Sequence, residues 1–279
     1  MKKFFKKSSI YTVLSIAVII SILPVLWIFM LSLKSPMETM ALPPKLFFKP
    51  TLESYRMLFG GNETTNVINL TIYLKNSFIV AFISTLVTML FATLGAYSLS
   101  RFRFKGKNMI SIIILATRML PPLASSIPLF LIFQNAGLFD THLGLVMAYT
   151  AINIPFAIWM VRGFIDDVPV EIEEAAHVDG CSRLGMLWKI IIPVTTPGIA
   201  ASAAYTFILA WNDFSLAMML TSSNVKTMPQ VVLSFLTPEG IEYGPMTAAA
   251  TIALIPPIIF IIFAQKYLAR GLTMGAVKG

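Results

Sequence analysis

The stretch EIEEAAHVDGCSRLGMLWKIIIP, residues 171–193, carries the most specific pattern in this chain. Pro169, just before it, suits the first turn of a helix, and the glutamates that follow favour the N-terminal end. Gly180 supplies the positive φ that ends a helix in a tight turn, and Ser182 is a good N-cap for a second helix. The stretch therefore predicts a short helix, a glycine turn and a second helix from about Arg183 to Ile191. Two prolines, Pro193 and Pro197, are expected to separate this element from the next apolar run.

One side of the first predicted helix is suited to contact another protein. Helix spacing places four residues on that side, two of them adjacent alanines that leave a shallow surface. Glu173 and Glu174 add negative charge beside it, which favours a partner with a basic cleft. The four residues are Ile172, Ala175, Ala176 and Asp179.

Outward from this stretch, the chain is built from long apolar runs. Hydrophobic residues make up 57% of the 279 residues, and charged residues make up 12%, about half the usual share for a soluble protein. So few charges do not cover the surface of a soluble domain, and a run of about 20 apolar residues is long enough to span a bilayer. We therefore predict an all-α membrane protein. Its six transmembrane helices are expected at residues 9–33, 72–100, 108–133, 143–163, 198–220 and 244–267.

Lys and Arg residues are spread unevenly over the segments between these runs. If the N-terminus is cytoplasmic, fourteen of the 21 fall on the inside and six on the outside, and Arg118 lies within a run. The densest clusters, at the N-terminus and at Arg101–Lys107, directly abut predicted helices. The positive-inside rule then places both termini and the 171–193 stretch in the cytoplasm. The basic residues behind the net charge of +8 lie at the ends of predicted spans. We therefore expect membrane lipid, and not nucleic acid, as a partner.

A cleaved signal peptide is the alternative for the first apolar run, because lysines precede it. The run is longer than a signal h-region, and no small-x-small cleavage site follows. Pro24 and Trp27 also fit an ordinary first span, so we expect this segment to be retained.

The 171–193 stretch resembles the EAA loop of ATP-binding-cassette (ABC) importer permeases. That signature is Glu-Ala-Ala, three residues, Gly, nine residues, Ile, any residue, then Leu-Pro. This chain has Glu174-Ala175-Ala176, Gly180, Ile190 and Ile192-Pro193, with Ile in place of Leu. In the family, this loop is a coupling helix seated in a groove of the ATPase subunit. The resemblance implies ATPase coupling by Glu173, Glu174, Ala175, Ala176, Asp179, Gly180, Ile190 and Pro193.

Further motifs resemble those of carbohydrate-importer permeases, in particular the second permease of maltose-type systems. They are Arg118-Met119 with Pro121 and Pro128-Leu129, the run Asn153–Phe156, Trp211–Phe214 and the tail Gly271–Gly279. The acidic residue of the tryptophan motif is Asp213 here, where Glu is common. In that subfamily the tail reaches the ATPase dimer interface, which implies ATPase contacts for Thr273, Gly275 and Lys278.

The resemblance also suggests a division of the chain. Residues 1–71 are expected to hold an N-terminal segment, the first span and an extracytoplasmic loop. Residues 72–267 would form the permease domain, with its coupling loop at about 164–197. Residues 268–279 would be a cytoplasmic tail.

Arg118 and Asp213 are the two charges that lie deep in predicted spans. A charge there usually faces the bundle interior or a water-filled path. Either both line a solute pathway, or they form a structural ion pair. Asn153, Trp211 and Asn212 are weaker pathway candidates, because asparagine in a span often bonds a neighbouring helix.

By this resemblance the chain is a permease subunit that moves a sugar or sugar-like solute across the prokaryotic cytoplasmic membrane by alternating access. Its implied partners are a second permease, two ATP-binding subunits and an extracytoplasmic solute-binding protein. ATP and Mg are expected on the ATPase. The chain itself is not expected to be an enzyme, because it lacks a phosphate-binding loop, and two histidines and one cysteine give no catalytic triad or metal cluster.

The sequence leaves two other classes of membrane protein as alternatives. An ion-gradient-driven secondary transporter expects ionisable residues near mid-membrane, for which Arg118 and Asp213 give slight support. A membrane enzyme acting on lipids would need a polar constellation at the interface, and the sequence does not show one. The identity of the solute stays open.

Overall fold

The structure of the protein, a computed structural model, describes residues 2–60, 68–119, 126–238 and 240–275. Its regular structure is helical, as predicted, apart from one short two-stranded hairpin. The chain divides into two compact units, and each unit contains segments from both halves of the sequence.

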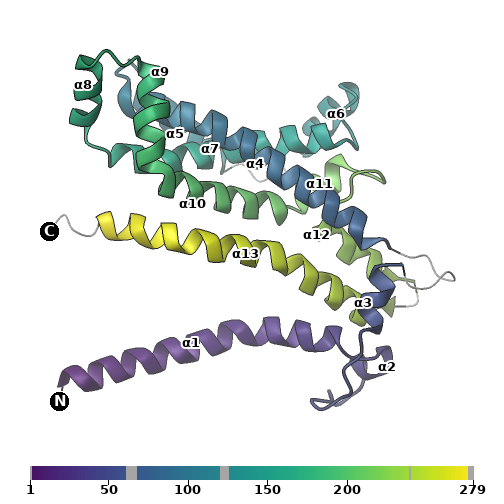
Figure 1. The fold of residues 1–279 in the computed structure, drawn as a ribbon. Helices are drawn as coiled ribbons and strands as arrows, with labels where there is room; N and C mark the ends of the chain where they lie inside the picture. The colour runs from purple at the N-terminus through teal and green to yellow at the C-terminus, as the bar shows by residue number, and fades with distance from the viewer. Residues whose placement is uncertain (1, 61–67, 120–125, 239, 276–279) are drawn as a thin grey trace. The chain divides into compact units, whose positions relative to one another are not determined.

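Unit 1, Met1–Thr71 with Val231–Ile255, contains the long N-terminal helix (Figure 1). Between Ile10 and Ser32 this helix is strongly apolar, and its most apolar 18-residue stretch has no buried residue. The Thr51 hydroxyl accepts the Glu53 N–H at 3.0 Å just before the short helix α3. The elements of unit 1 are α1 (Lys2–Ser32), α2 (Pro36–Thr39), α3 (Glu53–Leu58), η3 (Val232–Phe235), the antiparallel strands β1 (Leu236–Thr237) and β2 (Gly240–Ile241), and the first part of α13 (Tyr243–Gly275).

Unit 2, Ile72–Gln230 with Pro256–Gly279, holds the other elements. Figure 1 shows long helices side by side in this unit, with a short helical hairpin at one end. The elements are α4 (Leu70–Arg101), α5 (Lys107–Thr117), α6 (Ser126–Asn135), α7 (His142–Asp166), α8 (Val170–Val178), α9 (Arg183–Met186), the π-helical turn η2 (Leu187–Ile191), α10 (Ile192–Trp211), α11 (Ser215–Leu220), α12 (Met228–Val231) and the rest of α13.

The core of unit 2 forms where α4 and α7 pack against η2. Small residues such as Ala92, Ala96 and Ala157 are completely buried there, and they let the helix backbones approach closely. Helices α10 and α7 also approach each other closely, at Gly198 and Phe164. A Cβ placed on Gly198 would lie 2.1 Å from the Phe164 ring, so this position requires glycine.

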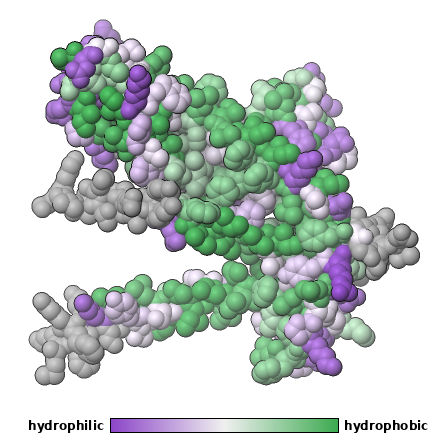
Figure 2. Space-filling view, viewed as in Figure 1, coloured by the Kyte–Doolittle hydropathy of each residue, from purple (hydrophilic) through white to green (hydrophobic). Residues whose placement is uncertain are grey.

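Apolar side chains also cover much of the outside of the helices, as Figure 2 shows. Phe82, Leu86 and Leu90 of α4 are exposed, in a row at helical spacing. Such a surface is unfavourable in water and suits lipid. Among the described residues, five helical segments are long and apolar enough to cross a membrane: Ile10–Ser32, Leu70–Arg101, His142–Asp166, Arg183–Trp211 and Tyr243–Gln265.

The predicted third span, residues 108–133, is not one continuous helix. Its first part, α5, ends at Thr117 and has 11 residues, which is too short to span a bilayer alone. Its second part, α6, starts at Ser126. The sequence between them contains Pro121 and Pro122, and proline removes a backbone donor and disfavours helix in the residue before it.

The predicted fifth span, residues 198–220, starts too late and is interrupted between Trp211 and Ser215. Pro193 directly follows the π-helical turn η2, in which the Ile192 N–H bonds the Leu187 carbonyl, and α9, η2 and α10 run on without the expected separation. Pro197 lies inside α10. The helix ends at Trp211, and α11 starts anew with the Leu216 N–H bonded to Asp213 Oδ1 at 2.9 Å.

The last helix is longer than predicted. The expected end was residue 267, but α13 continues to Gly275. Much of the expected tail, residues 268–279, is therefore helical up to that point.

Candidate functional site

The helix-turn-helix predicted around Gly180 is confirmed. Gly180 has a φ of +79°, and the Cys181 N–H closes the end of α8 on the Ala176 carbonyl at 2.9 Å. The Ser182 hydroxyl accepts the Gly185 N–H at 3.2 Å and caps α9. These local bonds shape a hairpin that projects from one end of unit 2 (Figure 1).

Helix α8 is exposed over most of its surface and buries a single carboxylate. Glu173 is its one buried residue, with 7% of its surface exposed. The apolar side chains of Val170, Ile172 and Val178 are exposed, Val178 at 87%. Figure 2 shows hydrophobic and hydrophilic residues mixed on the surface of this hairpin. Exposed apolar side chains on a helix that buries a carboxylate indicate a contact surface for another protein.

The structure separates the eight predicted coupling residues by exposure. Glu173 was expected to add negative charge to the docking surface, and that expectation is wrong, because its side chain faces α4. The exposed members are Glu174, Ala175, Asp179, Gly180 and Pro193, and the half-buried members are Ala176 and Ile190.

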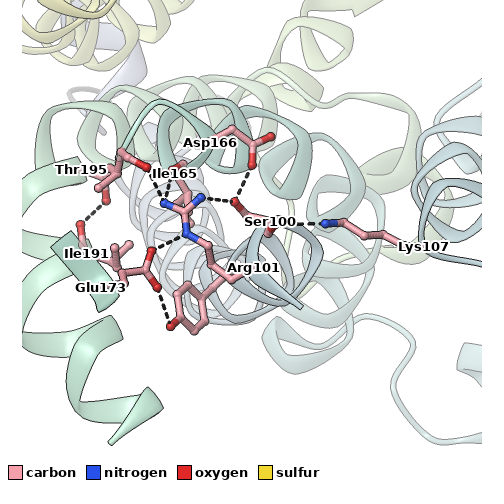
Figure 3. A network of polar contacts seen from close by, with 10 residues as sticks. Ser100, Arg101, Lys107, Ile165, Asp166, Glu173, Ile191 and Thr195 are labelled. Carbon is pink, nitrogen blue, oxygen red and sulfur yellow. Dashed lines mark hydrogen bonds and ion pairs between the residues drawn. The ribbon is translucent and has the colours of Figure 1, made fainter. Parts of the chain in front are cut away.

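Two residues of α4 hold the Glu173 carboxylate (Figure 3). Arg101 Nε forms an ion pair with Glu173 Oε1, and the Tyr97 hydroxyl donates to Glu173 Oε2 at 3.1 Å. The side chains of Arg101 and Glu173 are 9% and 8% exposed. In the sequence, Arg101 was used only as a positive charge that indicates the cytoplasmic side, and Tyr97 was not predicted as a site residue. The available signal was their spacing of four residues, which puts both on one face of a helix.

A second polar site is a cavity of about 390 Å³ within unit 2. It lies where α5 ends, beside the middle of α7 and the end of α10. Arg118 follows the last residue of α5, and its Nη1 donates to the Ile152 carbonyl at 2.8 Å and to Asn153 Oδ1 at 3.3 Å. The Tyr149 hydroxyl donates to the Asp213 carbonyl at 3.2 Å. The lining residues are Arg118, Tyr149, Ile152, Asn153, Ile208, Leu209, Asn212 and Asp213.

Four of the five predicted pathway residues therefore line one cavity. The fifth, Trp211, is buried and stacks its ring on Phe207 with centroids 5.8 Å apart. Arg118 and Asp213 face the same space, but within the described part of the chain no ion pair joins them. Arg118 lies at a helix end and not in mid-helix as predicted. Tyr149 was missed, although a tyrosine hydroxyl inside an apolar run usually has a polar partner.

The predicted tail contacts fall at the end of the described chain. Thr273 and Gly275 belong to the last turns of α13, whereas Lys278 lies outside the described residues.

The sequence matches the family described as binding-protein-dependent transport system inner membrane component, over residues 88–274. It is 32% identical to the inner membrane ABC transporter permease protein YcjP of Escherichia coli, over 100% of this chain and 99% of that protein. It is 33% identical to the trehalose/maltose transport system permease protein MalG of Thermococcus litoralis, over 94% of this chain and 93% of that protein.

A solved structure supports the fold. It is the crystal structure of a bacterial ABC transporter involved in the import of the acidic polysaccharide alginate. One of its chains aligns with a TM-score of 0.76 at 24% identity, over 95% of this chain and 96% of that chain.

Proposed function

The chain belongs to the family of binding-protein-dependent transport system inner membrane components, and from that premise we propose that it moves a sugar or sugar-like solute by alternating access. It is a permease subunit of an ABC transporter in the inner membrane. The proposal concerns the solute, the partners and the residues that serve each of them.

Relatives and the cavity both support a sugar-like solute. Similar permeases are named for trehalose, for trehalose and maltose, and for sulfoquinovosyl glycerol. The cavity gathers a guanidinium, two amides and a carboxylate among apolar side chains. Such a mixture of donors and acceptors suits a solute with many hydroxyl groups. We assign solute contact to Arg118, Asn153, Asn212 and Asp213.

The exposed side of α8 supports ATP-binding subunits as partners. Its adjacent alanines, Ala175 and Ala176, allow close approach, and Glu174 and Asp179 supply negative charge at an exposed edge. We place an ATP-binding subunit there, with ATP and Mg bound by that subunit. A second permease, a second ATP-binding subunit and an extracytoplasmic solute-binding protein complete the proposed complex. Thr273, Gly275 and Lys278 are proposed as further ATPase contacts.

The proposed topology has six spans and both termini in the cytoplasm. Five spans are the long helices described above, and α5 with α6 would together make the sixth crossing. The Lys and Arg distribution supports a cytoplasmic location for the α8–α9 hairpin. The opposite end of unit 2 would then face the solute-binding protein.

The single observation that carries this proposal is a protruding helix that exposes Val170, Ile172 and Val178 within a family-specific motif. Co-purification tests it. A tagged chain extracted from its native membrane should bring down an ATP-binding subunit, and uptake should stop when cellular ATP is depleted while the ion gradients are maintained. A chain that recovers no ATPase, with uptake that survives ATP depletion, would contradict the proposal.

A further inference from the structure

Arg101, the last residue of α4, directs its guanidinium nitrogens to three elements (Figure 3). Nε pairs with Glu173 on α8, and Nη1 donates to Ser100 Oγ on its own helix at 3.1 Å. Nη2 donates to the Ile165 carbonyl at 2.9 Å and to the Val168 carbonyl at 2.7 Å. Only a guanidinium has donors in a rigid fork that can serve such separate acceptors together.

The two carbonyls mark the place where α7 gives way to α8. Ile165 lies in the last turn of α7, and Val168 lies in the short linker that follows. Carbonyls at the end of a helix lack partners within that helix, and a cation beside them is favourable. Arg101 therefore caps α7 and fixes the linker that leads into α8.

The attachment of α8 to α4 depends on charge and not on apolar packing. Glu173 is the one buried residue of α8, and both of its carboxylate oxygens are bound by α4, through Arg101 and Tyr97. Buried ion pairs add little net stability, but removing one partner leaves an uncompensated buried charge. The pair thus fixes the orientation of α8 and loses that function when either partner is removed.

The same network reaches α5, which ends at the cavity. Lys107 Nζ donates to the Ser100 carbonyl at 3.0 Å, and Arg162 Nη1 donates to Ser111 Oγ at 2.9 Å. Asp166 joins these residues, because it accepts from Ser100 Oγ and pairs with Arg162 at 3.3 Å. Helix α5 therefore meets the network at its beginning, and Arg118, directly after its last residue, lines the cavity.

From these contacts we infer that Arg101 is a positioning residue that makes α8, α4 and the end of α7 move as one body. The inference rests on the proposed function, in which an ATP-binding subunit displaces α8. With Arg101 in place, that displacement is passed to α4 and α5, and so to the cavity. Without it, α8 would move on its linkers, and the cavity would stay where it is.

The test uses the whole complex, purified through a tag on this chain and reconstituted in liposomes. Spin-labelled cysteines replace His177 on α8 and Ile112 on α5, both exposed, in a Cys181→Ser background. In the wild-type network the distance between labels should keep one narrow distribution with and without ATP. In Arg101→Met it should broaden and change on ATP binding. Stimulation of ATP hydrolysis by the solute-binding protein should fall by about tenfold or more.

Three further variants keep the test decisive. Arg103→Met removes an exposed positive charge two residues away and should behave as wild type. Arg101→Lys retains the charge but not the fork, so it should give an intermediate distance change and intermediate stimulation. If Arg101→Met does not assemble, Arg101→Lys and Glu173→Gln carry the test. Arg101 and Glu173 variants that keep wild-type distances and stimulation would overturn the inference.

This result can be separated from failure of the proposed function. If the wild-type chain recovers no ATP-binding subunit, the proposed function fails. If the wild-type complex is ATP-driven and the Arg101 variants remain fully coupled, only the positioning role fails. A label distance that changes with ATP in the wild-type complex would also overturn the claim that these elements move as one body.

Discussion

At one end of unit 2, α8 meets α4 through the ion pair of Glu173 with Arg101, whereas at the other end Asp140 binds a loop through main-chain hydrogen bonds. Asp140 itself has a positive φ of 55°. Its carboxylate accepts the backbone N–H groups of four successive residues at 3.0 to 3.2 Å. These residues are Ser222, Ser223, Asn224 and Val225.

Side chains of two long helices support the Asp140 end as well. Asn76 Nδ2, on α4, donates to the carbonyls of Asn224 and Lys226 at 3.3 and 3.1 Å. His142 Nε2, at the start of α7, bonds Asn76 Oδ1 at 2.9 Å. The loop is therefore held by its own backbone, so its shape depends little on which side chains it carries.

The two ends of unit 2 therefore differ in what their polar contacts hold in place. The Asp140 end fixes the shape of a loop, while the Arg101 end orients a helix whose apolar residues face outward. A loop fixed by its backbone is suited to stay still, whereas α8, joined to α4 and the end of α7 through Arg101, is suited to pass on a partner's movement. Variants at the two ends should therefore change different measurements.

The largest effect on transport is expected for Glu173→Lys, with Glu174→Lys as the matched control. The first places an ammonium group against Arg101 in a buried site, and the loss of such a pair costs about 3–5 kcal/mol. The second changes an exposed charge on the same helix. ATP-driven uptake in proteoliposomes should be abolished by Glu173→Lys, whereas Glu174→Lys should weaken ATPase binding in a salt-dependent way. Equal effects would remove the distinction between the buried and exposed faces of α8.

Gly180→Val should have the next largest effect. A β-branched residue is disfavoured at a φ of +79°, by roughly 1–2 kcal/mol or more, although no atom lies within 4 Å of the new Cβ. The turn between α8 and α9 should therefore change shape while membrane insertion continues. We expect solute uptake per ATP hydrolysed to fall by about tenfold. Gly163→Val, at a glycine of α7 with open space around it, is the control. Full coupling in Gly180→Val would show that this turn does not set the position of α8.

Arg118→Ala and Asp213→Ala test whether the cavity between the two ends binds solute. Each removes a charged group that lines it, so the apparent affinity for solute should weaken by roughly tenfold, as for one lost hydrogen bond to a charged group. The maximal rate of ATP hydrolysis should remain, because neither residue touches α8. Thr117→Ala, next to Arg118 but exposed, should leave uptake affinity unchanged. Normal affinity in both charge variants would remove the pathway assignment.

Asp140→Ala should lower stability with little change in coupling. Four backbone N–H groups lose their acceptor, at a cost on the order of 1–3 kcal/mol. The midpoint of thermal unfolding in detergent should fall, while uptake per ATP by the surviving complex stays at the wild-type value. A fall in coupling equal to that of Glu173→Lys would mean that both ends transmit movement.

The smallest effect is a pH dependence at Asp140. Burial by itself raises the pKa of this carboxyl, but the N–H donors of residues 222–225 lower it, and the net pKa lies below the ordinary value. Because the folded pKa is the lower one, the stabilisation is complete above the unfolded pKa and is lost as pH falls through the folded pKa. The unfolding midpoints of the wild type and Asp140→Asn should therefore converge below about pH 4. A constant difference down to the lowest pH would contradict this assignment.

Local features of the hairpin could be predicted from the sequence because short-range chemistry decides them. Gly180 ends α8 and Ser182 caps α9 through bonds to residues only a few positions away. The long apolar helices were likewise evident from composition. The burial of Glu173 could not be predicted in this way. Helix spacing defines faces, but which face turns inward depends on Arg101, 72 residues earlier in the chain.

Two helix boundaries were mispredicted for a related reason. Proline was expected to separate two elements, yet the helical run continues through Pro193, which directly follows the π-helical turn η2. Asp213 was considered for its charge, and its role in starting α11 was overlooked. The cavity requires three elements to meet, and the sequence does not show that Asn212 lines it while its neighbour Trp211 is buried.

The most direct test of the central claim uses Cys181, the single cysteine of the chain, which lies in the turn after α8. A thiol-directed photo-cross-linker on Cys181 is compared with the same reagent on Ser222→Cys in a Cys181→Ser background, which places it at the Asp140 end. The complex should yield an adduct with an ATP-binding subunit from residue 181 and none from residue 222. An adduct with the ATPase from residue 222, and none from residue 181, would contradict it.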